Sequence, residues 1–147
     1  MFEKVVWATD GSQSADQTLP NAKALVAADG GSLTAVHCEE YTLPGKGGGS
    51  LPLHVGEDTL IKKIEGQVAE LSEGGVPAEL KVVKASVGGA AQAIADVARA
   101  EDADVIVVGT RGHTPLGGLL LGSVTHRLLH VAPCPVLAVP TRQQGAG

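Results

Sequence analysis

The sequence predicts an α/β protein, in which a doubly wound sheet of five parallel strands lies between two layers of helices. Short apolar segments alternate with segments whose apolar residues recur at helical spacing, which is typical of repeated β-α units. The run Val105-Ile106-Val107-Val108 is uninterrupted, as expected for a strand buried on both faces. Aromatic residues make up only 2% of the chain. The core must therefore come from Val, Leu, Ile and Ala, which suits Val/Ile-rich strands under Ala/Leu helices.

The first half of the chain predicts a strand at residues 4–9, a helix, and a second strand at residues 32–38. The helix shows a capping-box pattern that begins at Ser14, and Gly30-Gly31 ends it. Pro20 predicts a kink in this helix or a displaced start. The segment from Tyr41 to Gly56 is rich in glycine and proline, so we expect a loop there.

The second half continues the alternation. A helix carries apolar residues at Leu60, Ile64, Val68 and Leu71, and a third strand follows at residues 78–85. A third helix begins near Gly88, the fourth strand is the Val105 run, and a last helix begins at Gly122-Ser123. Residues 136–139 form the fifth strand. We expect one domain over residues 1–141 and a frayed tail at residues 142–147.

In a sheet of this kind, ligands bind beyond the carboxyl ends of the strands, where the strand order reverses. If the order is 3-2-1-4-5, the reversal lies between the first and fourth strands. The polar loops Asp10-Gly11-Ser12 and Gly109-Thr110-Arg111-Gly112 follow these two strands. A buried strand, a glycine-rich loop and a helix start, in that order, favour a phosphate site, because the helix start offers unpaired amides and a positive dipole end.

The bulk properties exclude several classes of function. The net charge of −5 gives no overall basic field for nucleic acid. We find no apolar run of membrane-spanning length and no signal-peptide pattern. Cys38 and Cys134 have no metal-ligand spacing and imply no disulfide framework, and no cluster of His, Cys and Asp predicts a structural metal. The expected location is the cytoplasm.

The glycine spacing resembles a known family. Gly109, Gly112, Gly122 and Ser123 fit the pattern G-x2-G-x9-G-[S/T], which is typical of the nucleotide-binding branch of the universal stress protein family. The segments TDGS, GSVTHRLL and APCPVLAVP also fall where that family places them. The resemblance implies a Rossmann-like fold of the adenine nucleotide alpha hydrolase type.

The resemblance further implies binding of ATP or another adenine nucleotide, with Mg²⁺ or Mn²⁺ held through the phosphates. It implies a homodimer joined through the fifth strand, Val136–Val139. Asp10 matches a carboxylate beside the ribose and adenine, and Cys38 matches a backbone contact to adenine. The nucleotide-binding positions implied in this way are Ala8, Thr9, Asp10, Cys38, Val108, Gly109, Arg111, Gly112, Gly122, Ser123, Val124 and Thr125.

Simpler roles remain open for several of these residues. The glycines can be turn residues, Ser123 can be a helix N-cap, and Asp10 can cap the first helix. Arg111 can be a solvated surface arginine, although a guanidinium suits a phosphate. His37 is expected to pack or to hydrogen-bond at the end of the second strand.

We expect a regulatory or stress-response nucleotide-binding protein without catalytic residues. No Walker-type lysine and no clear general base accompany the motif, so any ATP hydrolysis should be slow. The competing functions are a slow ATP hydrolase or nucleotidyl-transfer enzyme, a flavodoxin-like electron carrier, and a dimeric scaffold that no longer uses nucleotide. HIGH-like or SGG-x-DS signatures, expected of the enzymes, do not occur in the sequence.

Overall fold

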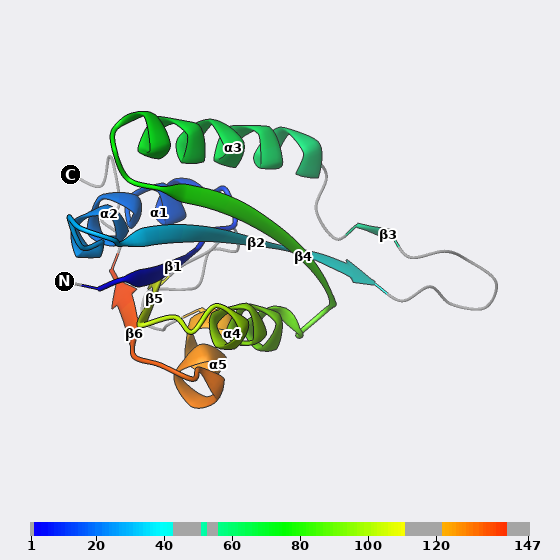
Figure 1. Ribbon diagram of the computed structural model, residues 1–147. Coiled ribbons are helices and arrows are strands. Elements are labelled where there is room, and N and C mark those ends of the chain that lie inside the picture. Colours follow the sequence, from blue (N-terminus) through cyan, green and yellow to red (C-terminus); the bar gives the residue numbers. More distant parts are fainter. Residues whose placement is uncertain (1, 43–50, 53–55, 111–121, 141–147) are drawn as a thin grey trace, which may run out of the picture.

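The computed structural model describes residues 2–42, 51–52, 56–110 and 122–140. Within these residues a single mixed sheet separates two layers of helices (Figure 1). The strands are β1 (Lys4–Ala8), β2 (Ser32–Thr42), β3 (Leu51–Pro52), β4 (Ala78–Ser86), β5 (Val105–Gly109) and β6 (Val136–Val139). The helices are α1 (Gln13–Asp16), α2 (Leu19–Leu25), α3 (Glu57–Glu73), α4 (Ala90–Ala100) and α5 (Ser123–Val131).

The five long strands are parallel and lie in the order β4-β2-β1-β5-β6. This confirms the order 3-2-1-4-5 predicted from the sequence. Strand β2 continues to Thr42, four residues beyond the predicted end at Cys38, and its last residues pair with the short antiparallel strand β3. Part of the expected loop between Tyr41 and Gly56 is therefore sheet.

The first predicted helix is two short helices in the structure. Ser12, not Ser14, caps α1, because the Ser12 hydroxyl accepts a bond from the Ala15 amide at 3.2 Å. The capping box at Ser14 was therefore wrong. The expected displacement at Pro20 is confirmed: α2 starts at Leu19 and keeps the proline in its first turn, where its missing N–H breaks no helical bond. Helix α2 also ends at Leu25, before the glycine pair.

The core is divided between the two faces of the sheet. Val5 and Trp7 of β1 pack in one cluster, with residues of α2 and α3, and Val6 and Ala8 pack in the other, with residues of α4 and α5. All five residues of β5 are buried, as the uninterrupted apolar run predicts. Helices therefore pack on both faces of β1 and β5, and this packing holds the carboxyl ends of the two strands in place.

Trp7 also connects β1 to the segment between α1 and α2. Its side chain is fully buried, and its indole Nε1 donates to the Thr18 hydroxyl at 2.8 Å. The same hydroxyl donates to the Ala15 carbonyl at 2.7 Å. This chain of bonds connects β1 to the break between α1 and α2. No helix in the described part of the chain is long and apolar enough to cross a membrane.

Candidate functional site

The carboxyl ends of β1 and β5 meet at one edge of the sheet. The two strands pair directly, with Trp7 opposite Val107, so the loops that follow them start side by side. This confirms the predicted position of the order reversal. The edge assembles most of the expected site residues, while Arg111 and Gly112 lie outside the described residues. The described members at or near this edge are Ala8, Thr9, Asp10, Cys38, Val108, Gly109, Gly122, Ser123, Val124 and Thr125.

The start of α5 is tied to the end of β5 by two hydrogen bonds. The Gly122 amide donates to the Thr110 carbonyl at 2.7 Å. The Thr125 hydroxyl donates to the Gly109 carbonyl, also at 2.7 Å, and this side chain is buried. The first turn of α5 is therefore held against the end of β5, whatever path residues 111–121 take.

Gly122, not Ser123, is the N-cap of α5, and it brings no side-chain hydrogen bond to the helix start. Ser123 is the first helical residue and is exposed. The simple N-cap role for Ser123 was therefore wrong. The first amides of a helix have no partner within the helix. The amides of Ser123 and Val124 thus form, with the positive end of the helix dipole, a place suited to an anion.

The backbone of Gly122 does not require a glycine. Its φ of −58° and ψ of 156° are accessible to any residue. Glycine is a common N-cap residue, and without a side chain it leaves the backbone at the helix start open to the close approach of another group. The same residue begins the G-[S/T] pair of the sequence pattern.

The loop after β1 is rigidified by its own side chains. The Thr9 hydroxyl accepts a bond from the Gly11 amide at 3.1 Å, and Asp10 Oδ1 accepts one from the Ser12 amide at 3.0 Å. Gly11 has a φ of +79°, which disfavours other residues, and a Cβ there would lie 2.7 Å from Leu60 Cδ2. The Asp10 carboxylate is therefore presented on a fixed turn.

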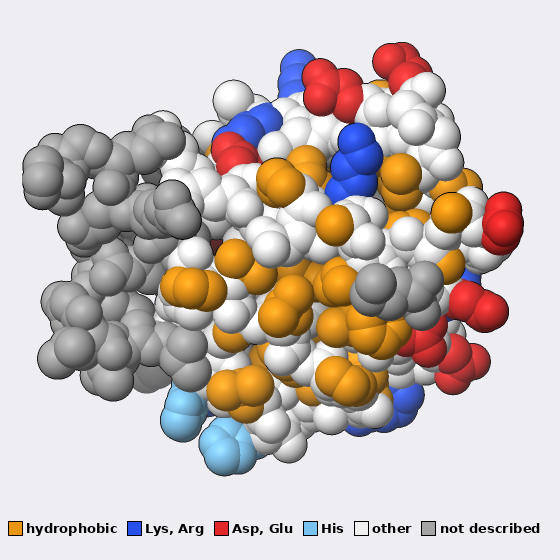
Figure 2. All heavy atoms as spheres, turned by 90° about the vertical axis from the view of Figure 1, so that its left-hand side faces the viewer, with side chains coloured by type: hydrophobic (Ala, Val, Ile, Leu, Met, Phe, Trp, Pro, Cys, Tyr) orange, Lys and Arg blue, Asp and Glu red, His pale blue; other side chains and the backbone are white. Residues whose placement is uncertain are grey.

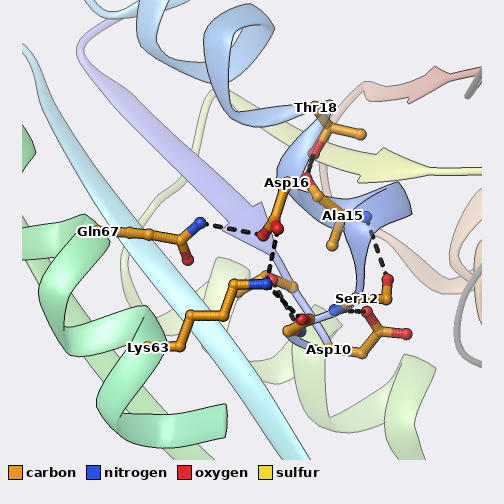
Figure 3. A network of polar contacts seen from close by, with 9 residues as sticks. Asp10, Ser12, Ala15, Asp16, Thr18, Lys63 and Gln67 are labelled. Carbon is orange, nitrogen blue, oxygen red and sulfur yellow. Dashed lines mark hydrogen bonds and ion pairs between the residues drawn. The ribbon is translucent and has the colours of Figure 1, made fainter. Parts of the chain in front are cut away.

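Helix α3 holds this loop from the side (Figure 3). Lys63 Nζ donates to the Gly11 carbonyl at 2.8 Å and pairs with Asp16 at 2.6 Å. Gln67 donates to the other oxygen of Asp16 at 3.0 Å. Lys63 was not predicted as a residue of the site, because only the packing of α3 against the sheet reveals a contact between residues so far apart in the chain.

His37 contacts the backbone directly after β1. It is buried, its Nδ1 lies 3.0 Å from the Thr9 carbonyl oxygen, and its Nε2 lies 2.6 Å from Glu57 Oε2. The ring therefore bridges the Thr9 carbonyl after β1 and the Glu57 carboxyl group at the start of α3. The expected hydrogen bonding of His37 is confirmed, but the expected place at the end of the second strand is wrong, because β2 continues to Thr42 and His37 lies within it. Glu57, the first residue of α3, was not foreseen.

Cys38 follows His37 on β2 and is partly buried. Burial, and then the negative charges of Glu40, Glu57 and Glu39, raise the pKa of its thiol to about 11. The side chain is therefore a neutral thiol across the physiological pH range. It therefore contributes no charge to this edge of the sheet.

The raised pKa of Cys38 predicts slow alkylation. In a Cys134→Ser background, iodoacetamide should react with Cys38 at pH 8 roughly a hundredfold more slowly than with an exposed thiol of ordinary pKa, because only the thiolate attacks. The rate should still rise about tenfold per pH unit between pH 8 and pH 10. A rate that levels off near pH 9 would show that the thiol has an ordinary pKa.

Comparison with known proteins identifies a matching family, similar relatives and similar solved structures. The model of the Universal stress protein family matches residues 1–140. A universal stress protein of Thermus aquaticus, encoded in the QAH/OAS sulfhydrylase 3′ region, is 35% identical over 147 residues, covering 95% of this chain and 99% of that protein. The solved structure of the hypothetical protein MJ0577 superposes with a TM-score of 0.78 at 23% identity, covering 98% of this chain and 99% of that one.

Two further similar structures contain nucleotides. One is a universal stress protein in complex with cAMP, with a TM-score of 0.65, 24% identity and coverage of 94% of this chain and 96% of that one. The other is the Archaeoglobus fulgidus universal stress protein in complex with dAMP, with a TM-score of 0.65, 24% identity and coverage of 95% and 98%. At this identity the likeness establishes the fold. With the family model matching nearly the whole chain, this chain belongs to the universal stress protein family.

Proposed function

We propose that this chain binds an adenine nucleotide, ATP in the first place, at the edge where β1 and β5 end. The observation that carries the proposal is the start of α5. Its first amides have no side-chain cap, and Gly122 is a glycine without a torsional reason. An anionic phosphate close to this backbone accounts for both features. The spacing of Gly109, Gly112, Gly122 and Ser123 adds support from the sequence.

The phosphates would lie between Gly109 and the first turn of α5. Ser123 is exposed, so its hydroxyl is accessible to a phosphate oxygen as well as its amide. Thr125 has a different role, since its buried hydroxyl already donates to the Gly109 carbonyl and so fixes the helix against the strand. Arg111 would supply the counter-charge, and Mg²⁺ or Mn²⁺ would be held through phosphate oxygens and water.

The ribose and the base would lie toward β1 and β2. Asp10 presents a carboxylate on a fixed turn, which suits the hydroxyls of ribose. Ala8, Thr9 and Cys38 would meet adenine through backbone groups, so a thiol in place of an aliphatic side chain should be tolerated. The proteins crystallised with cAMP and dAMP hold adenine nucleotides on the same fold, which supports this class of ligand.

We infer a regulatory role in a stress response rather than rapid catalysis. Lys63 is a cation beside the β1–α1 loop, and the Gly11 carbonyl and Asp16 engage its ammonium group. It therefore stabilises the loop instead of neutralising a γ-phosphate. The alternatives are slow ATP hydrolysis, and a scaffold that does not use nucleotide. The uncapped start of α5 favours a bound nucleotide over the scaffold.

We also propose that two copies pair through β6. In the described part of the chain this strand pairs only with β5, and Leu137 on it is 38% exposed. The Pro135 carbonyl accepts a bond from the Ile106 amide of β5, and the Val139 carbonyl accepts one from the Thr110 amide just after β5. Along a strand, the N–H and C=O groups of successive residues point alternately to the two neighbouring positions in the sheet. The N–H and C=O groups of Val136 and Ala138 therefore point away from β5, to the open edge of the sheet. An open apolar edge of this kind can pair with another strand.

Substitution of Gly122 tests the nucleotide site. Gly122→Val should lower ATP affinity by at least about a hundredfold, because its side chain occupies the space of the phosphate, and should change the free energy of unfolding by less than about 1 kcal/mol. The measurement is calorimetric titration with ATP, alongside urea unfolding. Gly66→Val is the matched control, since Gly66 is exposed on α3 with nothing within 4 Å of an added Cβ. Unchanged ATP affinity in Gly122→Val would reject the site.

Substitution of Ala138 tests the dimer. Ala138→Pro removes an outward N–H from β6 and leaves the bonds to β5 intact, so it should convert a dimer to a monomer. Light scattering at micromolar concentration measures the mass. Ala138→Val keeps the N–H and should stay dimeric. A monomeric wild-type protein, or a proline variant as dimeric as the wild type, would contradict pairing through this edge.

A further inference from the structure

Two exposed histidines lie one turn apart on α5. His126 and His130 are separated by four residues, so their side chains project from the same side of the helix. Their ring centroids are 5.1 Å apart and the ring planes meet at 70°. Figure 2 shows histidine side chains next to each other at the lower edge of the molecular surface. Neither residue is used by the proposed nucleotide site.

The distance between the rings fits a shared metal ion. Zinc binds a histidine nitrogen at about 2.1 Å, which places the metal about 3.2 Å from the centre of each ring. A tetrahedral angle of about 109° between the two ligands then separates the centroids by about 5.2 Å. The observed separation of 5.1 Å agrees with this value. The rings meet edge-on in the structure, so chelation requires the side chains to turn about their torsions until one nitrogen of each ring faces the ion. A square-planar ion, with ligands at about 90°, requires about 4.5 Å by the same geometry.

The surroundings leave the ring nitrogens available. Within the described residues, the two rings contact each other and no hydrogen bond or ion pair engages their nitrogens. Arg127 lies between them in sequence, but its guanidinium donates to the Gly88 carbonyl at 2.6 Å and so turns toward the start of α4. His130 is in the last turn of α5, where the negative end of the helix dipole favours a cation.

We propose that His126 and His130 chelate a divalent transition-metal ion, with zinc as the best fit. No group of three or more His, Cys, Asp or Glu residues in the described chain could hold a metal. The described residues therefore supply two ligands, and water can fill the other two tetrahedral positions. Imidazole nitrogens favour zinc over magnesium, which prefers oxygen. The ion is thus distinct from any Mg²⁺ that accompanies a nucleotide.

Zinc titration of the nucleotide-free protein, in competition with a chromogenic chelator, tests the proposal. The wild type should bind one zinc ion per chain at this site. His126→Asn and His130→Asn should each weaken binding by at least about tenfold, and the double variant should lose little more, because one imidazole alone does not chelate. A millimolar excess of Mg²⁺ should not displace the zinc.

Two further variants make the test specific. Leu129→Asn changes another exposed residue of the same turn and should leave zinc affinity unchanged. His130→Cys supplies a different zinc ligand and should retain binding. Equal zinc affinity in the wild type and the double variant would overturn the proposal. So would a loss as large in Leu129→Asn as in the histidine variants. Circular dichroism checks that every variant is folded.

Discussion

The pairing of β1 with β5 is the constraint on which the rest of the structure depends. Both strands are buried on both faces, and they lie side by side although about a hundred residues separate them. Parallel pairing brings their carboxyl ends to one edge, and the order reversal there leaves room for a ligand between the following loops. The turn at Asp10 and the first turn of α5 come to the same edge of the sheet because these strands pair.

A second set of contacts makes this edge rigid before any ligand arrives. His37 holds the Thr9 carbonyl and Glu57, and Lys63 holds the Gly11 carbonyl and Asp16. The Lys63 bond to the Gly11 carbonyl is charge-assisted and partly buried, so it is stronger than the exposed Lys63–Asp16 ion pair. A loop that is already ordered loses less entropy on binding. Helix α3, whose residues make no nucleotide contact in the proposal, thereby contributes to the site.

Much of this arrangement was predictable from the sequence. The strand order and the neighbouring loops follow from the β-α alternation, and the start of α5 follows from the glycine spacing. The break between α1 and α2 was only half foreseen. The sequence pattern favoured a cap at Ser14, whereas Ser12 caps α1, and the hydrogen bonds of the buried Thr18 to Trp7 and Ala15 appear only in the packed structure. The roles of Glu57 and Lys63 depend on packing between distant segments. The histidine pair on α5 was visible as a four-residue spacing, but the distance between its rings required the structure.

The central claim is that one adenine nucleotide spans the edge from β1 to α5. Titration of ¹⁵N-labelled protein with ATP, followed by NMR, tests it most directly. The amides of Gly11, Ser12, Ser123 and Val124 should shift along one saturation curve, with adenosine alone affecting mainly the β1 side and tripolyphosphate mainly the α5 side. ATP that leaves these amides unchanged, or that shifts only residues elsewhere such as those of β4, would contradict the account.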